Sequence, residues 1–189
     1  FDSNVQSILT RKYPSRDAQV KVINSTSTSL DNYMYNYSEI DQIEIYSDNP
    51  YMMEYKQYHP VTQAIAEEDW YQKAVEQSSV FWVEMVSYDK YNNEYWNLCL
   101  VRKIPLVNSD YHAVLVIRVS DNYLNTRVSS QEYQMCASVD EGRIFYATSK
   151  DDYGQQQVVD IDYDENYFRY AGSLKLHNKT CFVDVSTLH

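Results

Sequence analysis

The chain has 189 residues, a formal net charge of −11 and a hydrophobic content of 44%. A field this negative repels phosphate backbones and anionic headgroups, which disfavours nucleic acid and membrane surfaces as ligands. No run reaches the ~18 consecutive apolar residues of a membrane-spanning helix, so we expect a soluble domain, or the soluble piece of a larger protein.

Two compositional biases bear on the fold. The chain has 20 tyrosines but only 3 glycines, and none of these precedes Gly142. Turns in the first part must therefore use Asn, Asp and Pro. The change in composition near residues 130–140 indicates a boundary between two parts. The three cysteines have no CxxC spacing, and we expect them to be small buried hydrophobes.

The first segment, residues 3–37, spaces its apolar residues by three or four, which predicts helices. We expect interruptions near Pro14 and at the Ser/Thr run 25–29. The apolar stripe is thin, so it fits either a helix lying on its own domain or one that packs on a second copy.

The next segment changes periodicity and predicts a strand over Ile40–Tyr46, followed by a turn. A short helical turn is expected over Val61–Ala66. Asp69 then stands where a cap would begin a helix over Trp70–Gln77, with Gln72 in the capping-box position.

Three strands and a helix are predicted to follow. Joints rich in Asn and Asp favour an antiparallel meander of 80–86, 95–103 and 112–120, and residues 121–129 form a connecting helix. Gly142 then lies in a hairpin signal. The remaining predicted strands are 135–139, 143–148, 157–161, 167–176 and 180–185.

Three segments carry a resemblance to a known family. They are Trp70-Tyr71-Gln72-Lys73-Ala74, Ala113-Val114-Leu115-Val116-Ile117 leading into Tyr123-Leu124, and Val139-Asp140-Glu141-Gly142-Arg143-Ile144. In this order they resemble the double Cache sensor domain of bacterial transmembrane receptors, especially sensor histidine kinases.

The resemblance implies an α+β fold, in which a long N-terminal helix is followed by two stacked PAS-like modules with antiparallel sheets. The implied boundaries are an N-terminal helical segment at 1–39, a membrane-distal module and connecting helix at 40–129, and a membrane-proximal module at 130–189. A ligand pocket would lie in the distal module, under the Trp70-Tyr71 helix.

The predicted site departs from the pattern of the family's amino-acid sensors. Those members carry an Arg two residues before the Trp, where this chain has Glu68, and an Asp on the last strand, where it has Arg118. Trp82 and Glu84 stand where the family has a Tyr-x-Asp.

Glu84 and Arg118 interrupt apolar strands, so each must be paired, solvated or used. They could pair with each other. Alternatively, Arg118 would hold a ligand's anion while Glu84 or Glu68 receives a cation. Two indoles and a phenol, from Trp70, Trp82 and Tyr71, would then wall the pocket, although the same rings could be plain core.

The sequence lacks the common motifs for metal binding, catalysis and phosphate binding. The four histidines are scattered, residues 160–171 lack the Gly and Glu of a calcium loop, and no nucleophile elbow or phosphate-binding loop occurs. We therefore expect no metal, no cofactor and no catalytic activity in this chain.

The sequence favours an extracytoplasmic domain that senses a small molecule for a membrane receptor, with a histidine kinase as the expected output. The expected ligand is an organic acid, an amino acid or an amine. A homodimer could form through the N-terminal helix, and the membrane would be reached only through flanking helices. The alternatives are a secreted carbohydrate-binding module and a ligand-free dimeric spacer.

Overall fold

A computed structural model describes residues 2–88, 91–92 and 94–129, and four strands of the C-terminal part. Its elements in chain order are α1 (Ser3–Thr10), α2 (Arg16–Asn36), β1 (Ile40–Ser47), β2 (Tyr58–Pro60), α3 (Gln63–Ala66), α4 (Asp69–Glu76), β3 (Phe81–Tyr88), β4 (Glu94–Lys103), β5 (Ala113–Val119), α5 (Asp121–Ser129), β6 (Cys136–Ser138), β7 (Ile144–Ala147), β8 (Arg169–Leu176) and β9 (Lys179–Ser186).

The two N-terminal helices are separated at Pro14, as expected. Ser15 caps α2 by accepting a hydrogen bond from the backbone N–H of Ala18. The expected break at 25–29 is wrong, because α2 runs through this segment. Hydroxyls in the run bond to helical carbonyls one turn back, as Thr26 does to Ile23 at 2.9 Å.

The main sheet has the strand order β2-β1-β5-β4-β3. The predicted meander is confirmed, since β3, β4 and β5 pair antiparallel in that sequence. However, β1 pairs with β2 in parallel, so the expectation of a purely antiparallel sheet is wrong. Asn92 and Asn108, in the two joints of the meander, have φ values of 63° and 52°. Asparagine thus supplies the left-handed turn positions that glycine usually takes.

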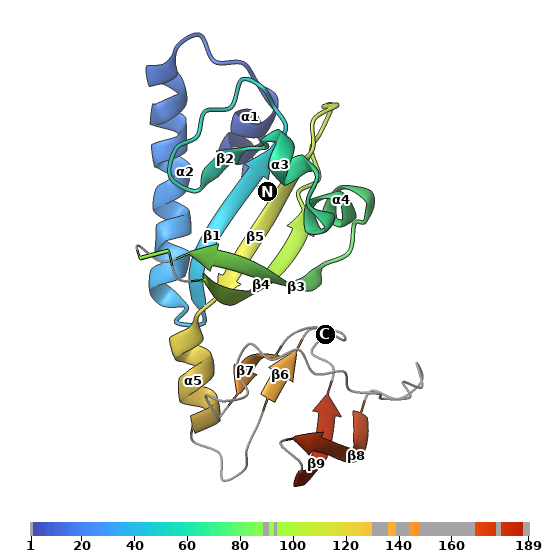
Figure 1. Ribbon diagram of the computed structural model, residues 1–189. Coiled ribbons are helices and arrows are strands. Elements are labelled where there is room, and N and C mark those ends of the chain that lie inside the picture. Colours follow the sequence, from blue (N-terminus) through green and yellow to red (C-terminus); the bar gives the residue numbers. More distant parts are fainter. Residues whose placement is uncertain are drawn as a thin grey trace.

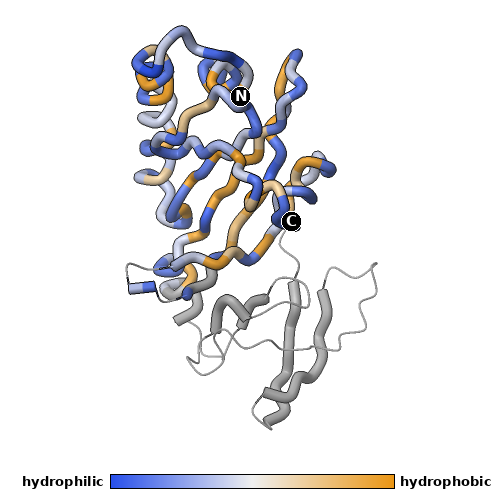
Figure 2. Tube along the Cα trace, turned by 45° about the horizontal axis from the view of Figure 1, so that its top comes forward, coloured by the Kyte–Doolittle hydropathy of each residue, from blue (hydrophilic) through white to orange (hydrophobic). Residues whose placement is uncertain are grey.

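Side chains alternate along each strand, so the sheet has two faces. Helices cover both of them. The helix-pair face lies against α1 and α2, and its core includes Ile8, Ile23, Ile45 and Tyr58. The opposite face, the α4 face, carries a second core under α4. Figure 1 shows α2 along one side of the sheet and α3 and α4 on the other, and Figure 2 shows hydrophobic stretches gathered in the central strands.

The C-terminal part contains two antiparallel hairpins. β6 pairs with β7, and β8 pairs with β9, which confirms strands predicted at these positions. The predicted strand at 157–161 lies outside the described residues. The α+β class is confirmed, whereas the two stacked modules and the boundaries 1–39, 40–129 and 130–189 stay predictions.

Candidate ligand-binding site

Helix α4 covers the sheet with a small apolar side. Tyr71 and Ala74 are buried and Val75 is partly buried, as their three- and four-residue spacing predicts. Lys103 of β4 donates a 2.6 Å hydrogen bond to the carbonyl of Val75, which ties the last turn of α4 to the sheet.

The predicted capping box at the start of α4 is wrong. Glu68 is the N-cap residue, and its side chain makes no capping bond in the part of the chain that the structure describes. Asp69 is already helical, where its charge still favours the positive end of the helix dipole. Gln72 instead donates to the carbonyl of Ala66 at 3.3 Å.

Three aromatic rings meet below the start of α4. Trp70 contacts Tyr46 of β1 edge-on, with 5.4 Å between ring centroids, and it contacts Tyr71 edge-on at 5.7 Å. Tyr46 also lies 5.3 Å from the imidazole of His59 on β2. These are the distances at which aromatic pairs attract each other beyond simple burial.

The hydroxyl of Tyr71 is buried and has no partner in the described part of the chain. The residue is 6% exposed, and its hydroxyl finds no hydrogen bond among the described residues. Burial, and secondarily the charge of Asp48, raise the pKa of Tyr71 to about 12. The hydroxyl therefore remains a donor at neutral pH. A buried donor of this kind costs roughly 1–3 kcal/mol when nothing accepts its proton.

A row of polar side chains crosses the α4 face below the rings. Arg118 donates from Nε to Glu44 Oε2 at 2.9 Å and from Nη1 to Ser87 Oγ at 2.9 Å. Asn97 also donates to Ser87 Oγ at 2.9 Å. The row thus joins β1, β5, β4 and β3 at the floor of the α4 face.

The row also affects the ring above it. Burial, and secondarily the charge of Glu44, raise the pKa of Tyr46 to about 12, although Arg118 opposes the shift. The phenol of Tyr46 therefore stays protonated at neutral pH.

The six residues that the sequence nominated do not share one place. Trp70, Tyr71 and Arg118 lie on the α4 face. Trp82 and Glu84 pair with Leu100 and Leu98, and this register sends their side chains to the opposite face. Glu68 is exposed at the start of α4.

Two expectations about the arrangement of these residues are therefore corrected. Trp82 does not join Trp70 and Tyr71 in one wall, because it packs with Leu98, Val119 and Leu124. Arg118 pairs with Glu44 and not with Glu84.

Sequence reasoning missed three residues of the α4 face: Glu44, Tyr46 and His59. Glu44 interrupts the apolar run of β1 between Ile43 and Ile45, which is the same signal that singled out Glu84. His59 gave no comparable signal, since it lies in a strand of only three residues.

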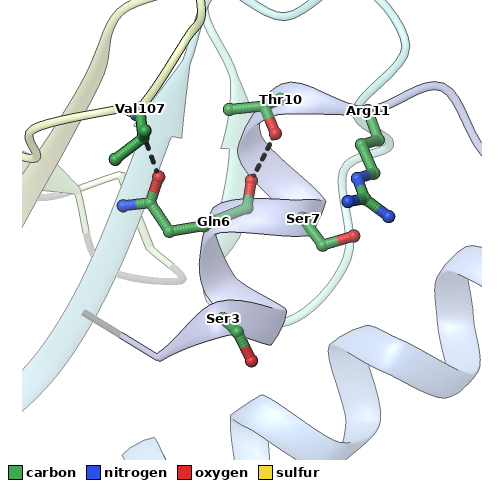
Figure 3. Close-up of a pocket in the computed structure, with 6 residues that line it drawn as sticks. All are labelled: Ser3, Gln6, Ser7, Thr10, Arg11 and Val107. Carbon is green, nitrogen blue, oxygen red and sulfur yellow. Dashed lines mark hydrogen bonds between the residues drawn. The ribbon is translucent and has the colours of Figure 1, made fainter.

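An open hollow of about 400 Å³ lies elsewhere, on the outer side of α1 (Figure 3). It is lined by Ser3, Gln6, Ser7, Thr10, Arg11 and Val107. Several of its polar groups already bond within the chain. Gln6 bridges to Pro105 at 2.8 Å and Val107 at 3.4 Å, and Thr10 bonds to the carbonyl of Gln6 at 2.7 Å. The two bonds of Gln6 attach α1 to the loop between β4 and β5.

Metal ligands do not gather in the described ranges, where no group of three or more His, Cys, Asp or Glu side chains is placed to hold an ion. The same part of the chain contains no helix with the length and apolar character needed to span a membrane.

Comparison with known proteins places the fold. No protein-family model and no curated protein sequence matches the chain. Among solved structures, the chain is similar to the ligand-binding domain of the Campylobacter jejuni chemoreceptor Tlp3, in complex with 4-methylisoleucine. The TM-score is 0.52 and the sequence identity 17%, over 94% of this chain and 69% of that one. The chain has the fold of a chemoreceptor ligand-binding domain. This agrees with the Cache-like fold that the sequence resemblance implies.

Proposed function

We propose that the chain is a ligand-sensing domain that binds a small molecule between α4 and the sheet. The observation that carries this proposal is the buried hydroxyl of Tyr71, which has no acceptor among the described residues. The fold supports it, since the chemoreceptor domain with the similar fold was solved in complex with 4-methylisoleucine. A ligand acceptor at Tyr71 would remove the cost of the unpaired donor.

The surroundings of Tyr71 favour a ligand with a polar head and an apolar body. A carboxylate or carbonyl oxygen would accept from the hydroxyl of Tyr71. An ammonium group would be attracted by Asp48, whose charge already acts on Tyr71, and by the faces of Trp70 and Tyr46. Amino acids, organic acids and amines are the ligand class that we propose.

We further propose that the domain is extracytoplasmic and non-catalytic, and that it belongs to a membrane receptor whose output is a two-component histidine kinase. Binding would shift the balance between two arrangements of the domain and its flanking membrane helices. The exposed side of α2 would provide contact with a second copy. The sequence resemblance to double Cache sensors supports this context, and the neighbouring genes and flanking segments would test it.

A thermal-shift screen tests the binding proposal. The purified chain is mixed with amino acids that include isoleucine and 4-methylisoleucine, and with organic acids, amines and sugars. A compound that binds the folded state raises the melting temperature by mass action. If no compound of these classes raises it, the sensing proposal is wrong.

The variant Tyr71→Phe then tests the site. It removes a hydroxyl that has no partner among the residues described by the structure, so we expect the free energy of unfolding to be unchanged or slightly higher. Affinity for the ligand found in the screen should fall about tenfold, which corresponds to one hydrogen bond of about 1.4 kcal/mol. Chemical denaturation measures the free energy of unfolding, and titration calorimetry measures the affinity for the ligand. Tyr35→Phe is the matched control, because Tyr35 is 89% exposed. Equal affinities in all three proteins would remove Tyr71 from the site.

A ligand-free spacer is the second candidate, and one observation favours it. Arg118 already has a buried carboxylate partner, so the charged floor of the α4 face is satisfied by the chain itself. A spacer would give no response in the screen. A carbohydrate-binding module is less well supported, since Tyr71 is buried and Trp70 is packed between two rings, whereas sugar-binding modules display their rings on an open face.

A further inference from the structure

Glu44 and Arg118 form an ion pair that is almost entirely withdrawn from water. Their side chains are 8% and 13% exposed, and Nε of Arg118 lies 2.9 Å from Oε2 of Glu44. The two residues come from neighbouring strands, since Glu44 pairs with Val116 and Arg118 with Gln42 in the ladder between β1 and β5. This register places both side chains on the same face of the sheet as Val116, which is the α4 face.

This pair changes what the floor of the site can bind. One guanidinium and one carboxylate leave no net charge, and Nη1 of Arg118 is directed to Ser87. A ligand carboxylate that approached Arg118 would have to displace Glu44 or share the guanidinium with it. Either outcome leaves two buried carboxylates to one guanidinium, and the excess negative charge is strongly unfavourable.

We propose that Glu44 is a specificity-determining residue, an internal counter-ion that occupies Arg118 and keeps anionic groups away from it. The inference rests on the proposed ligand-binding function and deepens it. The intact domain selects ligands whose head is neutral, zwitterionic or cationic at the end that meets the floor. Without the carboxylate of Glu44, the same floor becomes an anion site built around Arg118.

The contacts of Glu44 explain why one residue has this effect. Its Oε2 accepts from Arg118 at 2.9 Å, and its Oε1 accepts a 3.3 Å hydrogen bond from Gln42. The phenol of Tyr46 also lies near enough for the carboxylate to raise its pKa. The nearest other cationic candidate, Nε2 of His59, is 4.0 Å from Oε1. The carboxylate is thus held chiefly by Arg118, and an added carboxylate could replace it there with similar geometry.

Chemical rescue tests the inference without a natural ligand. Glu44→Ala removes the carboxylate and leaves space beside Arg118. Sodium acetate or propionate should raise the melting temperature of this variant in a saturable manner, and sodium chloride at equal ionic strength should not. The wild-type protein should show no saturable rise with either carboxylate. The double variant Glu44→Ala/Arg118→Ala should also lose the response, because the cation that binds acetate is gone.

Two results would overturn the inference. One is an equal acetate response in the wild-type protein, which would mean that Glu44 does not block Arg118. The other is no difference between Glu44→Ala and the double variant, which would mean that Arg118 does not bind the added carboxylate.

If Glu44→Ala fails to fold, Glu44→Gln keeps the size of the side chain and removes its charge. A matched ligand pair, 3-methylpentanoate and 2-methylbutylamine, then shares the apolar body of isoleucine but carries opposite charges. We expect Glu44→Gln to bind the acid at least tenfold more tightly than the wild type does, and to bind the amine no better. An unchanged ratio of the two affinities would contradict the role of Glu44. Failure of the sensing function itself would appear separately, as a wild-type protein that no compound of the screen stabilises.

Discussion

Tyr46 and Tyr71 on the α4 face make the stability of the fold depend on pH in the alkaline range. Burial is the main cause that raises the pKa of each to about 12, from a usual value near 10. A tyrosine whose pKa is higher in the folded state prefers to be neutral there. Its contribution to stability is complete below pH about 10 and is lost as the pH rises toward about 12, because only the unfolded chain ionises easily in that interval.

Tyr71→Phe should therefore reduce the alkaline loss of stability. Between pH about 10 and about 12, we expect the free energy of unfolding of the variant to fall less than that of the wild type, by up to roughly 2–3 kcal/mol. Urea unfolding at a series of pH values measures the difference. Tyr35→Phe, at an exposed tyrosine, should follow the wild-type curve. If the Tyr71 variant follows it as well, the phenol of Tyr71 does not titrate in the way described.

The ion pair shows what sequence can and cannot supply at the scale of one residue. A charge inside an apolar strand predicted that Arg118 is paired, solvated or used by a ligand, and the structure pairs it with Glu44. Glu84 is not this partner, because it lies one residue away from the positions of β3 that share a face with Arg118. Val83, and not Glu84, shares a face with Cys99 and Arg118 in the register of β3, β4 and β5. A shift by one residue reverses the face of every side chain, and because both faces of this sheet are covered, the apolar pattern of the strands does not show which face a residue takes.

At the scale of secondary-structure elements, the N-terminal helices share a buried core with the sheet. Ile8, Leu9 and Ile23 are fully buried in one core with Ile45 of β1 and Tyr58 of β2. The hydroxyl of Tyr58 donates to Thr26 of α2 at 2.8 Å and adds a polar link to the same packing. These helices therefore cover the sheet of their own chain, and α2 still presents an exposed side.

Truncation of one core side chain tests this packing. Leu9→Ala should lower the free energy of unfolding by about 2–5 kcal/mol, because it removes buried methyl groups and leaves a cavity between α1 and the sheet. Chemical denaturation measures the loss. Val107→Ala is the control for an aliphatic truncation, since Val107 is 70% exposed, and it should change stability by less than about 0.5 kcal/mol. A similarly small effect at Leu9 would mean that α1 is not part of the cooperative core.

Element boundaries followed from the sequence where local signals agree. The break at Pro14 is one example, because proline has no amide proton to continue a helix. The three strands of the meander are another, because each is a clear apolar run bounded by turn residues. β2 was missed because its three residues, Tyr58–Pro60, are defined by pairing with β1 rather than by a pattern of their own. The Ser/Thr run in α2 misled for a related reason. Burial of Thr26 and Ser27 against the sheet outweighs their weak helical preference.

For the molecule as a whole, the central sheet connects the two covered faces. Ile43 and Ile45 point to the helix pair, while Glu44 and Tyr46, which alternate with them along β1, point to α4. The backbone of β1 therefore carries Glu44 on one face and part of the helix-pair core on the other. If the flanking segments carry a signal to the membrane, β1 is the element through which an event below α4 reaches α1 and α2.

The overall charge leads to a prediction about salt. The chain carries 27 acidic residues against 16 Lys and Arg, and this net charge of −11 makes the compact state repel itself. Raising NaCl from about 0.01 M to about 0.3 M shortens the screening length severalfold. We expect the folded state to gain about 1 kcal/mol, which is a rise of about 2–4 °C in melting temperature for a chain of this size.

A charge-neutral double variant separates this global effect from the buried pair. Glu44→Gln combined with Arg118→Met removes one negative and one positive charge, so the net charge stays at −11. Because a buried pair is screened far less than surface charges, the double variant should start from a different melting temperature but rise with salt by the same increment as the wild type. Scanning calorimetry across the salt series provides both values. A melting temperature that falls with added salt would show that attractive surface pairs, and not the excess of acidic groups, dominate the electrostatics of the fold.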